Sequence, residues 1–158
     1  MDELNEVITA VQCHPSQCST FAYSSSRGVV NICDSRSSAL CHFAAKSFSH
    51  TSKKVGFSRN KFIADILNSI SDIKYSADGR FIFARDYLTV KVWDLNMESR
   101  PIKTVMLHEH LRPLLEDLFN ADSIFDKFEI CCRNDGKSFA TGSYKYICFY
   151  LFSNYYCD

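Results

Sequence analysis

One succession of strand, turn and strand occurs three times along the 158-residue chain, and it constrains the fold more than any other feature. In the clearest copy, Ile73 and Tyr75 alternate with polar residues, which is the period of a strand. Asp78 and Gly79 then mark a hairpin, because glycine adopts a positive φ angle without steric cost. Two short apolar runs complete the copy, so each copy predicts a small antiparallel sheet.

Two further segments follow the same order. Residues 8–34 turn at positions 14–16, and residues 125–152 turn at positions 134–136. The copies start further apart than the roughly 40–45 residues of a typical propeller blade. The excess falls into two inserts between the copies, and such loops are where propellers tend to bind partners.

Small sheets in series predict an all-β fold, a partial WD-repeat β-propeller of about three four-stranded antiparallel blades with a short helical insert. The WD signature is Trp93-Asp94, at the end of the middle copy. Residues 1–158 form one predicted domain, with blades at approximately 7–50, 69–107 and 124–152 and inserts at 51–68 and 108–123. The second insert is the predicted helix, because its leucines recur at helical spacing. Closed propellers need four to eight blades, so three blades predict a fragment or one piece of a larger assembly.

Charge and cysteine content narrow the class of protein. Eighteen basic and eighteen acidic residues cancel, so no overall field draws the chain to nucleic acid or membrane. The first residues do not resemble a signal peptide, and no apolar run approaches the roughly 20 residues that span a bilayer. We therefore expect a reducing location, the cytoplasm with the nucleus as an alternative. The eight cysteines should then be free thiols, most of them buried.

Several motifs, read in order, resemble the B-type (WD-repeat) regulatory subunit of protein phosphatase 2A. They lie at residues 2–10, 14–15, 20–21, 23–26, 38–41, 69–72, 85–98, 124–129 and 141–144. The stretch 85–98, Arg-Asp-Tyr-Leu-Thr-Val-Lys-Val-Trp-Asp-Leu-Asn-Met-Glu, is the most specific because it is long and unlike generic WD repeats. The resemblance covers nearly the whole chain but only about the middle third of that family's length.

This resemblance implies a non-catalytic subunit that recruits substrates and uses no cofactor or metal. The implied partners are the scaffold and catalytic subunits of protein phosphatase 2A, and phosphoprotein substrates that bind through short helical or linear motifs. The implied docking residues are Leu4, Val7, Phe62, Ile63, Phe125 and Lys127. Apolar side chains on loops, with an occasional charge, suit an amphipathic helix or a short motif.

The chain departs from the family in two places that matter for docking. Ile63 stands where the family usually has a second phenylalanine, so that position is aliphatic rather than aromatic. Residues 35–64 contain no Asp or Glu but six basic residues, whereas this insert is acidic in familiar members. We therefore expect basic substrate segments to be attracted less, or repelled, near this loop.

Other functions have weaker support in the sequence. Cysteines and histidines could be assembled into a metal site, either Cys13 with His14 and Cys18 or Cys131 and Cys132 with His108 and His110. No Cys-x-x-Cys pair is present, and adjacent residues of a strand point to opposite faces. Buried thiols therefore explain these cysteines better than zinc.

An enzyme would need a catalytic constellation. The tempting carboxylates Asp72, Asp78 and Asp86 are expected to hold tight turns instead, and no phosphate loop or nucleophile elbow is present. Basic residues around Phe57 and Phe62 could grip single-stranded nucleic acid, but such a run is more often a solvated loop. The main alternative is a generic WD-repeat interaction module, or an inactive fragment, without a phosphatase link.

Overall fold

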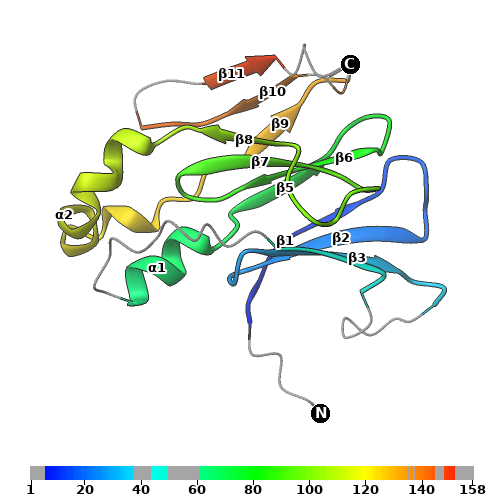
Figure 1. The fold of residues 1–158 in the computed structure, drawn as a ribbon, viewed down its shortest axis with the longest axis horizontal. Helices are drawn as coiled ribbons and strands as arrows, with labels where there is room; N and C mark the ends of the chain where they lie inside the picture. Colours follow the sequence, from blue (N-terminus) through cyan, green and yellow to red (C-terminus); the bar gives the residue numbers. More distant parts are fainter. Residues whose placement is uncertain are drawn as a thin grey trace.

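Three antiparallel sheets stand side by side in the structure, a computed structural model that describes residues 6–37, 44–49, 61–134, 136, 138–144 and 148–151 (Figure 1). The first sheet comprises β1 (Ile8–Cys13), β2 (Thr20–Ser25), β3 (Val29–Asp34) and β4 (Lys46–Ser49), hydrogen-bonded in that order. The second comprises β5 (Asp72–Tyr75), β6 (Phe81–Arg85), β7 (Thr89–Asp94) and β8 (Lys103–Met106). The third comprises β9 (Ile130–Cys132), β10 (Ser138–Thr141) and β11 (Cys148–Leu151).

The first strand of each sheet lies next to the first strand of the following sheet, so β1 contacts β5 and β5 contacts β9. Each sheet is a meander whose successive strands are neighbours, which is the topology of a propeller blade. The structure thus confirms the all-β, partial-propeller prediction. The third sheet has three strands within the described ranges, where four were expected.

The first two sheets enclose an apolar core. Val30 and Phe48 of the first sheet are buried against Ile82 and Trp93 of the second, and the Phe48 and Trp93 rings lie 5.4 Å apart. Fully burying a side chain of this size stabilises the fold by about 1.5–3 kcal/mol. The alternation seen in the sequence therefore buries one face of each strand against the neighbouring sheet.

The second and third sheets enclose a similar core. Phe83, Val90 and Val92 are fully buried against Ile130 and Phe139 of the third sheet. The Phe83 and Phe139 rings lie 5.5 Å apart. The middle sheet is thus covered on both faces, which explains why its strands are the most apolar of the chain.

Side-chain hydrogen bonds join the sheets beside these cores. Gln12 Oε1 accepts from Tyr75 N at 2.6 Å, linking β1 to β5. Asp72 Oδ2 accepts from Ile130 N at 2.8 Å, linking β5 to β9, while its other oxygen accepts from Ile73 N at 2.9 Å. Each bond satisfies a backbone donor that the sheets leave unpaired.

Gly79 allows the first and second sheets to approach closely where two of their hairpin turns meet. It has a φ of 72°, and a Cβ at this position would lie 2.3 Å from His14 Cε1. His14 Nε2 donates to the Gly79 carbonyl at 3.1 Å, and Nδ1 accepts from the backbone N–H groups of Ser16 and Gln17. The histidine therefore ties the two hairpin turns together.

Short helices gather at one end of the sheets (Figure 1). They are α1 (Lys61–Asn68), the 3₁₀ helix η1 (Glu109–Leu114), α2 (Leu115–Asn120) and the 3₁₀ helix η2 (Ser123–Phe125). Their buried side chains form a separate cluster with the turn after β6: Ile63, Leu67, Tyr87, Leu88, Leu115 and Ile124. The predicted helix in the second insert is confirmed, whereas α1 was not predicted. None of the helices in the described ranges is long and apolar enough to cross a membrane.

The structure describes the side chains of five cysteines, and none of these five forms a disulfide. Cys33 is buried and Cys132 half-buried, where burial raises the pKa of the Cys132 thiol to about 12. Cys13, Cys18 and Cys131 are exposed, so the expectation that most cysteines are buried is wrong for this set. The reason is positional, because Cys18 lies in a turn and Cys13 follows the exposed Val11 at the end of β1.

We predict that Asp72→Ala destabilises the chain by about 2–3 kcal/mol, because it leaves two buried backbone N–H groups without their acceptor. Urea denaturation measures the loss. Asp65→Ala is the matched control, because Asp65 is exposed on α1 and its removal should change stability by less than about 0.5 kcal/mol. Equal losses of stability in the two variants would contradict the role of Asp72 in joining β5 to β9.

We also predict selective alkylation of the thiols. Iodoacetamide at pH 8 should modify Cys13, Cys18 and Cys131 of the native chain, while Cys33 and Cys132 react only after unfolding in urea. Peptide mass mapping over time measures each rate. Modification of Cys33 as fast as Cys18 in the native chain would show that the first sheet is not packed as described.

Candidate functional site

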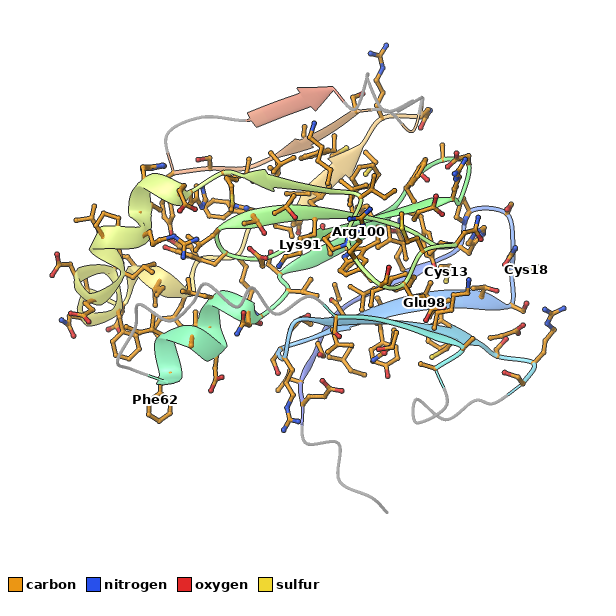
Figure 2. The ribbon with its side chains drawn as sticks, viewed as in Figure 1. Cys13, Cys18, Phe62, Lys91, Glu98 and Arg100 are labelled. Atoms are coloured by element: carbon orange, nitrogen blue, oxygen red, sulfur yellow. The ribbon has the colours of Figure 1, made fainter. Side chains whose placement is uncertain are left out.

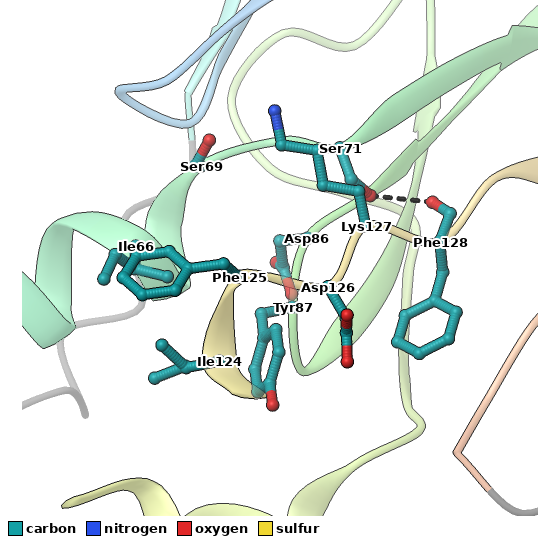
Figure 3. A pocket seen from close by; sticks show the side chains of 10 residues that line it. All are labelled: Ile66, Ser69, Ser71, Asp86, Tyr87, Ile124, Phe125, Asp126, Lys127 and Phe128. Carbon is teal, nitrogen blue, oxygen red and sulfur yellow. Dashed lines mark hydrogen bonds between the residues drawn. The ribbon is translucent and has the colours of Figure 1, made fainter. Parts of the chain in front are cut away.

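A pocket of about 140 Å³ opens at the helical end of the chain (Figure 3). Its lining comes from four separate stretches: Ile66 and Ser69 at the end of α1, Ser71 before β5, Asp86 and Tyr87 after β6, and the run from Ile124 to Phe128. The lining is mostly apolar, which is the usual character of a site that takes an apolar group. The pocket therefore joins the second sheet, α1 and η2.

The run that carries Phe125 and Lys127 is held at both ends. Ile124 is 1% exposed in the helical cluster and anchors the start. Ser71 Oγ donates to the Phe128 carbonyl at 2.9 Å, the bond drawn in Figure 3. The backbone between these two anchors turns outward, so Phe125 is 53% exposed and Lys127 is exposed beside it.

The Asp86 carboxylate at the pocket is already engaged. It accepts from the backbone N–H groups of Leu88 and Thr89, at 3.0 and 2.6 Å, and from the Thr89 hydroxyl at 2.7 Å. Lys91 Nζ lies 2.6 Å from its second oxygen. Asp86 therefore shapes the turn between β6 and β7 rather than offering a carboxylate to a ligand.

The other two carboxylates considered for catalysis also hold backbone. Asp72 bonds Ile73 and Ile130, and Asp78 accepts from Arg80 N at 3.1 Å and from the Ser76 hydroxyl. These bonds lower the pKa of Asp78 despite partial burial. Asp78 and Asp86 hold tight turns as predicted, whereas Asp72 links β5 to β9 instead. Within the described ranges, no three His, Cys, Asp or Glu side chains gather where a metal ion could be held.

The structure places the six predicted docking residues differently. Phe125 and Lys127 lie together at the pocket. Phe62 is 72% exposed on α1 and projects from the helix away from the sheets (Figure 2), and Val7 is 67% exposed just before β1. Ile63 is 1% exposed in the helical cluster, so it supports α1 from beneath. Leu4 lies outside the described residues.

Some pocket residues were not predicted from the sequence. Ile66 follows Phe62 and Ile63 at a spacing that indicates an amphipathic helix, and that pattern is a usable signal. Tyr87 and Ser71 carry no such signal, because only the packing of distant segments brings them to the pocket. Sequence reasoning could therefore have found the wall from α1 but not the opposite wall.

Exposed acidic side chains are frequent at the helical end. They lie on α1, on α2 and along the following segment: Asp65, Glu116, Asp117, Asp122, Asp126 and Glu129. Lys127 is an exposed base among them, and Arg112 pairs with Glu109 at 2.8 Å. Among the described side chains, exposed carboxylates thus outnumber exposed lysine and arginine side chains at the helical end.

Three of the six basic residues between positions 35 and 64 lie in the described part of the chain. Arg36 pairs with Asp34 at 2.7 Å and lowers the pKa of that carboxyl to about 2. Lys46 begins β4, and its Nζ donates to the Leu95 carbonyl at 2.5 Å. These two cations are thus engaged beside the first sheet, whereas Lys61 begins α1 next to Phe62. Residues 53, 54 and 59 lie outside the described residues.

Comparison with known proteins supplies the family. A scan against protein-family models finds no match. The alpha isoform of a B-type 55 kDa regulatory subunit of serine/threonine protein phosphatase 2A, from Oryza sativa subsp. japonica, is 54% identical over 144 residues. A serine/threonine-protein phosphatase 2A regulatory subunit from Dictyostelium discoideum is 49% identical over 144 residues. Both alignments cover 91% of this chain, but only 24% and 29% of the two relatives.

The chain therefore spans about a quarter of the length of these curated relatives. Identity near one half across nine-tenths of the chain agrees with the motifs that carried the resemblance, of which residues 85–98 are the most specific. The repeated four-stranded meander is the fold expected of such a segment. Over the part that it covers, the chain belongs to the family of B-type 55 kDa regulatory subunits of protein phosphatase 2A.

Proposed function

We propose that this chain is a non-catalytic, substrate-recruiting part of a protein phosphatase 2A complex. The observation that carries the proposal is the exposed pair Phe125 and Lys127 beside a pocket on the helical end of a chain whose relatives are named regulatory subunits. The scaffold and catalytic subunits are the proposed partners. The cytoplasm, with the nucleus as an alternative, is the proposed location.

The pocket fits a single aliphatic side chain from a partner. A volume of about 140 Å³ has room for one such group. The exposed rings of Phe62 and Phe125 add apolar area on the same end of the chain, as an anchored helix or short motif requires. Lys127 suits a partner carboxylate beside the anchor, because the two charges would be opposite.

The acidic surroundings suggest the charge of the rest of the partner. Exposed carboxylates on α1 and α2 favour a segment with basic flanks, and long-range attraction would raise its rate of association. This differs from the expectation drawn from the basic stretch 35–64, in which Arg36 and Lys46 are engaged beside the first sheet and Lys61 begins α1. We therefore propose an amphipathic segment with an aliphatic anchor, an adjacent acidic residue and basic flanks.

Asp72, Asp78 and Asp86, the aspartates considered for catalysis, bond to backbone or to Lys91, which supports a non-catalytic role. A WD-repeat interaction module without a phosphatase link is the second candidate. It is favoured by the repeated antiparallel meander, a fold that by itself specifies no particular partner.

Co-purification distinguishes the two candidates. The tagged chain should retain the scaffold and catalytic subunits, and the isolated chain should release no phosphate from a phosphopeptide. Immunoblotting and a phosphate-release assay measure the two results. Absence of both subunits from the purified chain would favour the module without a phosphatase link.

Docking on the helical end makes a second prediction. Phe62→Ala with Phe125→Ala should weaken binding of substrate proteins by about tenfold or more, because the loss of two aromatic anchors typically exceeds about 1.4 kcal/mol. Calorimetry or interferometry measures the change. Met106→Ala is the matched control, because Met106 is 52% exposed on β8 but does not line the pocket. Equal weakening by both changes would contradict docking at this site.

A further inference from the structure

His108 lies at the junction of the second sheet, the third sheet and the helical insert. It lies two residues after the end of β8, it is 0% exposed, and η1 begins at the next residue. The backbone N–H of Leu111 donates to its carbonyl at 2.9 Å, so the residue also starts the first turn of the insert. Any change at this ring therefore acts on three parts of the fold.

Both ring nitrogens of His108 make hydrogen bonds. Nδ1 lies 2.9 Å from the Tyr87 carbonyl, to which it must donate. Nε2 lies 2.9 Å from Ser143 Oγ, and in the neutral ring it accepts from that hydroxyl. The first bond reaches the turn after β6, and the second reaches the segment after β10.

Aromatic contacts extend from His108 to the segment that carries Phe125 and Lys127. The Phe128 and Tyr144 rings each lie 5.4 Å from the imidazole, and Phe128 follows Lys127 directly. Tyr144 donates to the Ser123 carbonyl at 2.9 Å and receives a bond from the Tyr87 hydroxyl at 2.9 Å. The positions of Ser123 and Phe128, on either side of the Phe125–Lys127 pair, thus depend on the packing around this ring.

A positive charge on His108 would meet other cations. Arg85, on β6, places its Nη2 3.4 Å from Nδ1, and the His110 ring on η1 lies 6.1 Å away. Tyr87 and Tyr144, the other titratable groups against the ring, are phenols whose pKa values are raised by burial, so they stay neutral. The negative charge of Asp126 also raises the pKa values of those two phenols. Burial lowers the pKa of His108, and the charge of Arg85 adds to that effect.

We propose that neutral His108 holds the helical insert against the second and third sheets through its bonds to Tyr87 and Ser143, a contact that we call the clasp. Protonation of His108 would release the segment that carries Phe125 and Lys127. Protonation would reverse the direction of the bond to Ser143 and place a second buried cation beside Arg85. The ring is therefore protonated more readily once it has left its site. The docking surface would then be held at neutral pH and loosened by acid, a regulation that rests on the proposed function.

The direction of the pH effect follows from proton linkage. An unfolded or released histidine has a pKa near 6.5, and the clasped ring has a lower one. The stabilisation is therefore complete above pH about 6.5 and declines as the pH falls below that value. Because release takes up one proton, the local opening constant should rise about tenfold per pH unit in this window.

Hydrogen–deuterium exchange of the full chain between pH 7.5 and 5 tests the clasp without a binding partner. Protection factors, corrected for intrinsic exchange, should fall for the amides of Leu111, Ala121 and Ile130 but not for those pairing β2 with β3. His108→Gln keeps a neutral donor and acceptor, so it should remove this pH dependence. His14→Gln is the matched control, because it changes the contact between the first and second sheets and should leave the pH dependence intact. An unchanged pH dependence in His108→Gln would overturn the proposal.

Nitrogen-detected NMR of the unaltered chain provides a readout that does not depend on how the variant folds. The expected result is an Nδ1–H tautomer for His108 that titrates below pH 6.5. Titration at or above 6.5, or an Nε2–H tautomer, would overturn the proposal. Loss of substrate docking at pH 7.5 would contradict the proposed function instead, because the clasp is judged by exchange and tautomer alone.

Discussion

Each sheet of this chain has two faces, and a face can leave water only when a neighbouring sheet lies against it. The Phe48 and Trp93 rings meet between the first and second sheets, and Phe83 meets Phe139 between the second and third. Ordering a residue costs about 1–2 kcal/mol of backbone entropy, which one small sheet does not offset. The stack of sheets, rather than any one of them, is therefore the unit that folds.

Polar side chains determine how the stacked sheets meet. Apolar contact alone is non-directional, so it would allow neighbouring sheets to slide. Gln12, Asp72 and His14 each bond a backbone group of the next sheet, and a slide would leave buried donors without acceptors. The aspartates that resemble catalytic groups in the sequence are part of the same framework. Their chemistry is used for architecture, which fits the family of regulatory subunits to which the chain belongs.

The candidate docking site arises where that framework ends. Inserts leave the sheets at one end, and their apolar residues form a cluster of their own around Ile63, Leu115 and Ile124. With those side chains buried, Phe62 and Phe125 remain in solvent beside an acidic surface. His108 connects this surface to the sheets. The site is therefore distinct from the propeller core but is held to it by hydrogen bonds. A site of this kind can change its order without unfolding the sheets.

Much of the fold could be predicted from the sequence, because strand alternation and the Asp78-Gly79 turn are local features repeated three times. The helical spacing of the leucines in the second insert likewise predicted a helix at its observed place. The exposure of Phe125 and Lys127 agrees with the docking role that the resemblance implied.

The tertiary structure alone decided which residues share the pocket and which docking candidates reach solvent. Phe62 and Ile63 are adjacent and both apolar, yet the orientation of α1 exposes one and buries the other. Ile66, Tyr87 and Phe128 meet although they are far apart in the chain. Local sequence determines which strands and turns form, because those depend on neighbouring residues. The surroundings of a side chain depend on contacts between distant segments, and these exist only once the sheets have stacked.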